Sequence, residues 1–289
     1  MPSPHTAQTV TAQTVTAQTV IAPNLGDRCS TMAVVEAHAK LTRSLRITGV
    51  RADGFHLIDA EMVTLDLADH LTISEHSAAT VLSADGPYSA GMPLDATNLV
   101  GRALALAGRR AHVHIHKVIP HGGGLGGGSA DAAAVLRWAG FEDLAAAAAI
   151  GADIAFCLVG GRGRVRGIGE IVEPMPFMAL DITLVIPPLQ VSTPAAYRAW
   201  DRLGGPTADG PNDLEPAAIA VVPELAIWRD RIGALAGCAP TLAGSGATWF
   251  VEGHVAALES LAPEATVVFA QTRPETRSDP RPALPIEGR

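Results

Sequence analysis

Six glycines surround a single leucine between Gly122 and Gly128, and this run is the segment of the chain best suited to chemistry. Residues 111–116 before it alternate with period two as in a strand, and residues 130–138 after it are good helix formers. Glycine removes the Cβ atoms that would hold an anion away from the backbone. A helix start adds unpaired N–H groups and a positive dipole end. The segment therefore predicts a loop that binds a polyphosphate.

The spacing separates this loop from two other glycine-rich phosphate loops. A Walker loop ends in Gly-Lys-Ser or Gly-Lys-Thr, whereas Ser129 follows Gly128 directly. A dinucleotide fingerprint can also be traced, but a run of glycines satisfies that pattern trivially. The remaining alternative is a flexible linker, which is not expected between a strand and a helix that Ser129 is predicted to cap. The residues assigned to nucleotide binding are Pro120, His121, Gly122, Gly123, Gly124, Leu125, Gly126, Gly127, Gly128, Ser129 and Ala130.

Three further segments, taken together with this loop, resemble the motifs of one known family. They are residues 39–56, which include Ala-Lys-Leu and Thr-Gly-Val-Arg-Ala-Asp-Gly-Phe-His, residues 151–153 (Gly-Ala-Asp) and residues 243–248 (Ala-Gly-Ser-Gly-Ala-Thr). In this order the four segments resemble the GHMP kinases, the superfamily of galactokinase, homoserine kinase and mevalonate kinase. Within it they are most similar to the kinases of 4-diphosphocytidyl-2-C-methyl-D-erythritol, which act in the non-mevalonate isoprenoid pathway. The likeness covers residues 34–268, which is most of the chain.

The resemblance implies ATP-dependent phosphorylation of the 2-hydroxyl group of that substrate. Lys40 and Asp153 match the family's catalytic pair. In that pair the aspartate accepts the hydroxyl proton, and the lysine orients the acceptor hydroxyl and offsets the charge on the phosphoryl group being transferred. By themselves, Lys40 would indicate a solvated surface charge and Asp153 a helix-end or turn residue. Asp153 is expected where a helix gives way to an apolar strand. Mg²⁺ is expected with ATP; Ser129 is a candidate ligand, and no protein carboxylate is assigned to the metal.

The expected partner is a small molecule, a sugar alcohol linked to cytidine diphosphate. Phe55 and His56 match the aromatic–histidine pair that the family uses on the cytosine ring, and Tyr197 matches a second aromatic that stacks on the same base. An aromatic ring stacks on a base for about 1–3 kcal/mol, and an imidazole can bond the base edge. The alternative for Phe55 is packing in the core.

Thr42, Gly244 and Ser245 complete the expected substrate site. The two residues of the glycine-rich turn are suited to contact phosphate or the sugar alcohol through backbone N–H groups. Thr42 stands where the family usually has asparagine, and the neighbouring Arg43 is more polar than the family pattern. These departures leave the Lys40–Asp153 pair and the phosphate loop in place, so we expect an active enzyme.

The resemblance also implies the architecture that positions these residues. We expect an α+β, two-lobed GHMP kinase fold, with a ribosomal-protein-like N-lobe over residues 32–178 and a ferredoxin-like C-lobe over residues 179–272. Residues 1–31 are expected to form a disordered extension that carries the repeats, and residues 273–289 a disordered tail. Strands are predicted at 34–37, 45–48, 62–65, 70–74, 111–118 and 181–186. Helices are predicted at 98–107, 130–138, 143–150, 194–202, 223–235 and 254–261.

Composition narrows the classes of partner. The 289 residues are 48% hydrophobic, enough for a substantial core, and 21 basic against 29 acidic residues give a net charge of −8. Nucleic acid is not expected as a partner, because proteins that neutralise a phosphate backbone are basic. No apolar run reaches the roughly 18 residues of a membrane span, so no membrane is expected. Three cysteines without metal spacing favour the reducing cytoplasm. The sequence does not indicate an oligomeric state.

Thr-Ala-Gln-Thr-Val occurs three times in residues 6–20, with too little apolar surface to fold alone. Met32 is a candidate natural start, since it precedes Lys40 by the short lead common in the family; an intact mass equal to the full 289 residues would contradict this. His112, His114 and His116 share one strand face and are interpreted as solvated rather than metal-binding. Arg162, Arg164 and Arg166 alternate after Asp153, and either extend the phosphate field or face solvent.

Two alternatives to the expected function stay open at this stage. Another small-molecule GHMP kinase, of the homoserine or mevalonate type, would share the loop and the catalytic pair. A non-catalytic relative would bind ATP without turnover.

Overall fold

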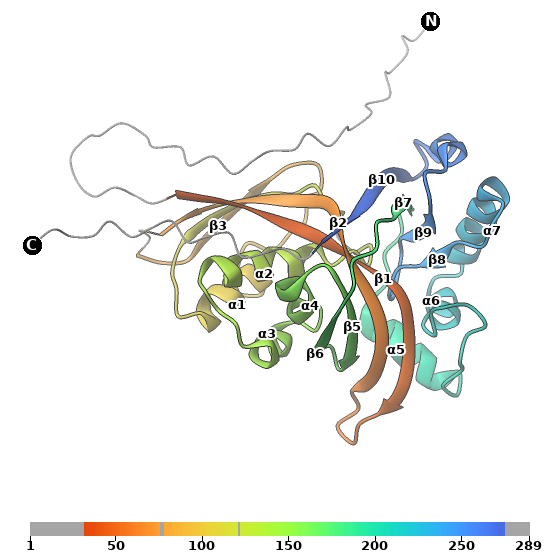
Figure 1. The fold of residues 1–289 in the computed structure, drawn as a ribbon, viewed down its shortest axis with the longest axis horizontal. Coiled ribbons are helices and arrows are strands. Elements are labelled where there is room, and N and C mark those ends of the chain that lie inside the picture. The colour runs from red at the N-terminus through yellow and green to blue at the C-terminus, as the bar shows by residue number, and fades with distance from the viewer. Residues whose placement is uncertain (1–31, 76–77, 121, 275–289) are drawn as a thin grey trace, which may run out of the picture.

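The computed structural model describes residues 32–75, 78–120 and 122–274, so the three repeats, Cys29, His121 and residues 275–289 lie outside the described residues. Two antiparallel strands of 19 residues each, β1 (Met32–Val50) and β2 (His56–Ser74), form its longest hairpin (Figure 1). The sequence predicted two short strands in place of each. The register shifts three times, between His38 and Lys40, Thr42 and Ser44, and Ile47 and Gly49. Each shift interrupts the alternation of inward and outward side chains, so the sequence pattern breaks where the strand does not.

Strand β2 carries most of the sheet. Along its length it pairs with β4 (His112–His116), β5 (Arg162–Gly167) and β10 (Thr266–Arg273) in addition to β1. Strand β3 (Val81–Asp85) runs parallel to β4, and β6 (Ile171–Met175) pairs with β5. Strand β10 continues to β7 (Asp181–Ile186), β9 (Trp249–Glu252) and β8 (Thr241–Leu242). The expected strands at 111–118 and 181–186 are thereby confirmed.

Four helices lie beside the β2–β5 part of the sheet (Figure 1): α1 (Leu99–Leu106), α2 (Gly127–Trp138), α3 (Leu144–Ile150) and α4 (Ile154–Val159). Three more accompany the C-terminal strands: α5 (Thr193–Arg202), α6 (Glu215–Val221) and α7 (Glu224–Ala236). The predicted starts at 98 and 143 are confirmed. Asn98 accepts from the Val100 N–H at 2.9 Å and Asp143 from the Ala146 N–H at 3.0 Å, as N-cap side chains do.

Three local predictions were wrong. Helix α2 begins at Gly127, and its N-cap is Gly126 with a left-handed φ of 69° and no capping side chain, so Ser129 lies inside the first turn and caps nothing. Residues 154–159 form helix α4, so Asp153 precedes a helix rather than an apolar strand. The segment predicted as a helix from residue 254 is a 3₁₀ turn, η1 (Ala256–Leu261). Short apolar runs do not distinguish a buried helix from a strand, which explains the error at α4.

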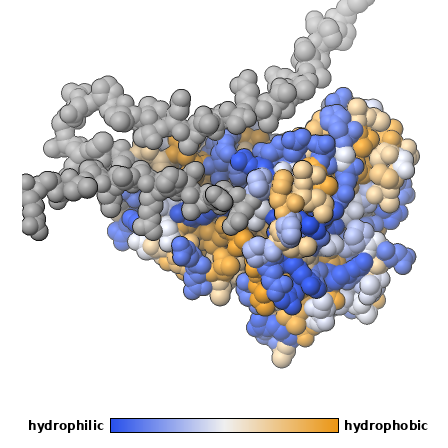
Figure 2. Space-filling model, viewed as in Figure 1, coloured by the Kyte–Doolittle hydropathy of each residue, from blue (hydrophilic) through white to orange (hydrophobic). Residues whose placement is uncertain are grey.

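The buried apolar residues form three clusters. One lies between α1–α4 and the β1–β2 sheet, the second is built from residues 185–267, and the third joins β1 and β2 to β7, β9 and β10. The α+β class is confirmed, whereas the lobe boundary at residue 178 stays a prediction; Arg273, assigned to the tail, pairs with Thr64 as the last residue of β10. Within the described ranges, no helix is long and apolar enough to cross a membrane. Figure 2 shows hydrophilic and hydrophobic residues interspersed over the visible face.

Candidate active site

The phosphate loop lies directly on strand β1. The backbone N–H of Lys40 donates to the Leu125 carbonyl at 3.0 Å, and a Cβ atom at Gly126 would lie 2.7 Å from Lys40 Cγ. Gly122, Gly124 and Gly126 all have positive φ, between 69° and 78°. Leu125 is fully buried and anchors the middle of the loop in the third apolar cluster. The loop therefore has the backbone conformation and the close approach that its glycines predicted.

Lys40 and Asp153 meet beside this loop. Lys40 Nζ lies 3.2 Å from Asp153 Oδ2 and donates to Thr42 Oγ1 at 3.1 Å. Lys40 is almost fully buried, against the surface position that the isolated residue suggested, while the Asp153 side chain is 33% exposed. A buried ammonium with two oxygen partners is held in one orientation, and the carboxylate beside it stays accessible to a substrate. The two charged residues expected to do the chemistry thus form one ion pair.

The glycine-rich turn of residues 243–248 packs against the same loop from the other side. The Thr248 N–H donates to the Gly123 carbonyl at 3.2 Å. A Cβ atom at Gly244 would lie 3.6 Å from Lys40 Nζ and 3.7 Å from Thr42 Oγ1. Ser245 Oγ lies 2.8 Å from Thr193 Oγ1 at the start of α5. The predicted substrate residues Thr42 and Gly244 therefore border Lys40, and Ser245 follows Gly244 in the same turn.

The remaining residues of the loop frame the start of α2. Pro120 and Ala130 are buried, and the Ala130 N–H donates to the Gly126 carbonyl at 2.8 Å. Gly128 is exposed, and Ser129 is half-buried in the first helical turn. An exposed helix start beside a buried ammonium is an electropositive surface, which suits the phosphates of a nucleotide.

A buried cluster of three charges, which the sequence analysis missed, lies under the loop. Lys117 Nζ bonds Asp69 Oδ2 and, at 2.8 Å, Asp131 Oδ2 on α2. Asp69 Oδ1 accepts from the N–H groups of Val118 at 2.5 Å and Ile119 at 2.8 Å. All three charged side chains are at most 4% exposed. The cluster fixes the segment that enters the loop to the second turn of α2, the helix that leaves it.

Burial is the largest single influence on the pKa values of Asp131 and Lys117, but at Lys117 the neighbouring carboxylates outweigh it. Burial raises the pKa of Asp131 to about 7, although Lys117 opposes the shift. Burial also lowers the pKa of Lys117, but the two neighbouring carboxylates reverse the effect and the net direction is upward. Lys117 therefore stays charged, and the upward shift in the pKa of Asp131 means that its carboxyl group binds a proton more readily than an exposed aspartate does.

Replacing Lys117 by methionine is expected to lower the free energy of unfolding by about 3–5 kcal/mol, because Asp69 and Asp131 would be left buried without a cation. Urea denaturation measures this loss. Arg231→Met is the matched control: it removes the cation of an exposed pair with Glu264 and should change stability little. Equal losses in the two variants would contradict a stabilising role for the cluster.

Asp131→Asn should remove a pH dependence of stability. Between about pH 4 and pH 7 the folded protein holds the Asp131 proton while the unfolded chain has lost it, so the stability contributed by this residue falls as the pH rises. Unfolding free energies at pH 5 and pH 8 measure the effect. The wild type should lose more stability than the variant over this interval, and identical slopes would contradict the assignment.

The histidine and tyrosine expected to bind the base lie side by side, with His56 at the start of β2 and Tyr197 on α5. The rings of His56 and Tyr197 have centroids 4.7 Å apart at an interplanar angle of 32°. Burial, followed by the nearby charge of Asp153, raises the pKa of the Tyr197 phenol, so this ring stays neutral. Phe55 lies apart on the β1–β2 turn, 56% exposed, with the Arg51 guanidinium 5.9 Å from its ring centroid. It is therefore not packed in the core, and its role on the cytosine ring stays a prediction.

The alternating arginines of β5 and the alternating histidines of β4 all have partners on neighbouring strands. Arg162 and Arg164 bond Glu61 and Asp59 on β2, and Arg166 bonds Glu173 on β6. They therefore brace the sheet rather than extend a phosphate field. On β4, His112 and His114 each lie 3.0 Å from Ser83 Oγ, and His116 lies 2.7 Å from Asp85 Oδ1. In the part of the chain that the structure describes, no group of three or more histidine, cysteine, aspartate or glutamate residues is arranged to hold a metal ion.

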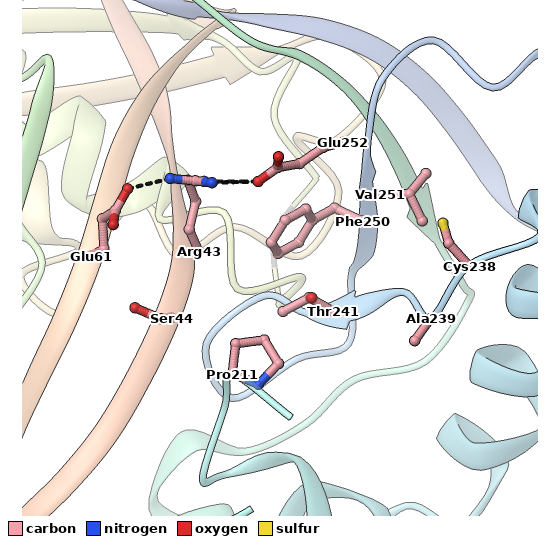
Figure 3. Close-up of a pocket in the computed structure, with 10 residues that line it drawn as sticks. All are labelled: Arg43, Ser44, Glu61, Pro211, Cys238, Ala239, Thr241, Phe250, Val251 and Glu252. Carbon is pink, nitrogen blue, oxygen red and sulfur yellow. Dashed lines mark hydrogen bonds and ion pairs between the residues drawn. The ribbon is translucent and has the colours of Figure 1, made fainter. Parts of the chain in front are cut away.

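A separate polar pocket of about 440 Å³ lies where β1 and β2 approach β8 and β9 (Figure 3). Arg43 crosses it and bonds Glu61 on β2 and Glu252 on β9. Lys40, Asp153 and the phosphate loop do not line this pocket. Because both ends of the guanidinium are occupied by carboxylates, we interpret Arg43 as a tie between strands. Its polarity, which departs from the family pattern, is thereby explained.

Asn212 is a further residue that the sequence analysis missed. Its amide donates to the carbonyls of Leu242 at 2.8 Å and Gly244 at 2.6 Å, and it is 1% exposed. It thus holds the glycine-rich turn beside Lys40. The turn-forming run Pro-Asn-Asp at residues 211–213 was the available signal, because such residues form side-chain bonds to neighbouring backbone groups.

Comparison with known proteins agrees with this geometry. Residues 94–161, which contain the phosphate loop and Asp153, match the model of the GHMP kinases N terminal domain. The chain is 41% identical over 236 residues to 4-diphosphocytidyl-2-C-methyl-D-erythritol kinase of Paracoccus denitrificans (strain Pd 1222), covering 74% of this chain and 84% of that one. It is 37% identical to the kinase of the same name from Cereibacter sphaeroides (strain ATCC 17029 / ATH 2.4.9), covering 81% and 94%.

A solved structure extends the likeness to three dimensions. The crystal structure of a 4-(cytidine 5'-diphospho)-2C-methyl-D-erythritol kinase superposes with a TM-score of 0.67 at 29% identity, over 83% of this chain and 98% of that one. The chain therefore belongs to the 4-diphosphocytidyl-2-C-methyl-D-erythritol kinase family, within the GHMP kinases.

Proposed function

We propose that the protein transfers the γ-phosphoryl group of ATP to the 2-hydroxyl of 4-diphosphocytidyl-2-C-methyl-D-erythritol. The observation that carries this proposal is the ion pair of Lys40 and Asp153, 3.2 Å apart beside a glycine loop that opens a helix. Phosphoryl transfer needs little covalent chemistry from the protein; it needs positioned phosphates, charge neutralisation and an acceptor for one proton. Each of these three requirements has a residue at this site.

In the proposed reaction Asp153 accepts the proton of the substrate hydroxyl, and the oxygen of that hydroxyl forms a bond to the γ-phosphorus of ATP. The bond from that phosphorus to the β–γ bridging oxygen breaks, and ADP leaves. Lys40 keeps the carboxylate oriented, and its charge offsets the negative charge that develops on the transferred group. Residues 120–130 supply backbone N–H groups and the helix start to the triphosphate.

Mg²⁺ fits the residues at the loop. The Ser129 hydroxyl, half-buried in the first turn of α2, makes no hydrogen bond within the described segments and offers an oxygen ligand of the kind that Mg²⁺ prefers. Mg²⁺ commonly takes only one or two protein oxygens and completes its shell with phosphate and water. When bound, it neutralises charge on the phosphates of ATP.

The second substrate is proposed to place its base against α5 and its sugar alcohol near Asp153. His56 and Tyr197 offer an imidazole and an aromatic face at the base end. At the catalytic end Thr42 and Gly244 lie beside Lys40, and Ser245 follows in the same turn. We assign the ATP-binding lobe to residues 32–178 and the second lobe to residues 179–272.

The test is ADP release by the full chain with ATP, Mg²⁺ and each of three acceptors: cytidylylated methylerythritol, homoserine and mevalonate. Turnover with the first acceptor, weakened by added cytidine nucleotides, is the expected result. Turnover with only homoserine or mevalonate would keep the GHMP kinase chemistry and overturn the substrate. ATP binding without turnover on any acceptor would favour the non-catalytic alternative.

A further inference from the structure

Three side chains on one face of α5 hold the His56 ring. Tyr197, Trp200 and Asp201 stand at positions i, i+3 and i+4, which point to the same side of a helix. The His56 ring lies 4.7 Å from the Tyr197 ring and meets the edge of the Trp200 indole at 5.5 Å and 83°. Its Nε2 atom lies 2.8 Å from Asp201 Oδ1. The imidazole is thus fixed in position by two rings and in protonation pattern by one carboxylate.

The support beneath His56 is itself rigid. Trp200 is 9% exposed, and its indole N–H donates to the Pro206 carbonyl at 2.9 Å. The His56 side chain is 10% exposed, although the residue follows an exposed turn. Asp201 is 47% exposed, and among the described residues only His56 pairs with its carboxylate. An exposed carboxylate that bonds an almost buried imidazole acts chiefly on that imidazole.

Chemistry then assigns the tautomer. A carboxylate only accepts hydrogen bonds, so the hydrogen of a neutral His56 stands on Nε2, where Asp201 accepts it. The other ring nitrogen, Nδ1, is left with a lone pair, and it has no hydrogen-bond partner within residues 32–75, 78–120 and 122–274. The ring therefore keeps one acceptor atom that no described residue uses.

We propose that Asp201 is a positioning and specificity residue: it holds His56 as the Nε2–H tautomer, so that Nδ1 accepts from the exocyclic amine of cytosine and discriminates against uracil. This inference rests on the proposed function. The two bases differ at that position, because cytosine carries an amino donor and uracil a carbonyl acceptor. An acceptor that faces an acceptor leaves both without a partner, which is the arrangement by which enzymes reject near-isosteric substrates.

The experiment compares Asp201→Asn with the wild type on the cytidine substrate and on its uridine counterpart. An amide presents both donor and acceptor atoms to Nε2, so it no longer selects one tautomer. We expect the KM for the cytidine substrate to rise about tenfold, as for the loss of one hydrogen bond, with kcat within about twofold. The preference for cytidine over uridine in kcat/KM should fall about tenfold, and the KM for ATP should not change.

The matched control is Asp230→Asn, which alters an exposed helical carboxylate on α7 that bonds Arg229. It should leave all these constants at their wild-type values. A merely structural role of Asp201 would lower kcat and raise both KM values without changing the base preference. An unchanged preference in Asp201→Asn, with an active wild type, would overturn the inference while the proposed function stands. A wild type inactive on the cytidine substrate would overturn the proposed function.

Nitrogen-15 NMR of the imidazole gives a second, independent readout. In the wild type the His56 signals should show a protonated Nε2 and an unprotonated Nδ1 at neutral pH. In Asp201→Asn they should move towards a mixture of tautomers. A wild-type ring with a proton on Nδ1, as the other tautomer or as an imidazolium, would overturn the proposal, because that nitrogen would then donate and the preference would favour uracil.

Discussion

Replacing Asp153 by asparagine is expected to lower kcat by about 10²–10⁴-fold while ATP still binds. The carboxylate is the only proposed acceptor for the hydroxyl proton, and an amide of nearly the same shape cannot take that role. Because Asp153 is 33% exposed and pairs with a buried Lys40, the substitution leaves the backbone hydrogen bonds of the loop untouched. The expected loss is therefore in turnover, with the ATP dissociation constant changed little.

Steady-state ADP release and ATP binding by calorimetry measure the two quantities. Asp143→Asn is a control from the same segment, since Asp143 caps α3 and asparagine caps helices equally well. It should keep wild-type turnover. If Asp153→Asn kept turnover within a factor of about ten, proton transfer to this residue would not limit the reaction and another acceptor would have to be sought.

Sequence patterns could indicate the candidate site because its parts are short and local. The phosphate loop, the lysine and the aspartate each have a signature within a few residues, and the structure brings the charged atoms of Lys40 and Asp153 to 3.2 Å although 113 positions separate them. The helix starts at Asn98 and Asp143 were equally local, since a capping side chain lies within three residues of its partner. Local signals of this kind survive in any tertiary context.

The elements that depend on distant partners were not predictable in the same way. The bulges of β1 and β2 keep two 19-residue strands continuous where the alternation of side chains fails. Gly126 replaces Ser129 as the cap of α2, because the loop enters the helix in a left-handed conformation that only the packing of Lys40 against it requires. Asp131 appeared as one more polar helix residue until Lys117 and Asp69 gave it a reason to be buried.

Gly124→Ala is expected to disrupt the phosphate loop strongly. At this position φ is +78°, and a Cβ atom would lie 2.2 Å from the Ala243 carbonyl oxygen and 3.1 Å from that of Gly246. The loop would have to move away from the glycine-rich turn, and with it from Lys40 and Thr42. A left-handed alanine costs about 1–2 kcal/mol, and a collision with fixed backbone adds about 1–3 kcal/mol. We expect the free energy of unfolding to fall by their sum and the KM for ATP to rise.

Gly91→Ala separates the two causes. Gly91 has the same φ of +78°, but a Cβ atom there would meet no atom within 4 Å, so this variant carries the conformational cost without the collision. Urea denaturation should therefore show a smaller loss for Gly91→Ala, and ATP kinetics should stay at wild-type values. Equal losses of stability would mean that the loop and the turn separate easily. In that case the close packing of residues 122–126 against residues 243–248 would not be what holds the phosphate-binding conformation.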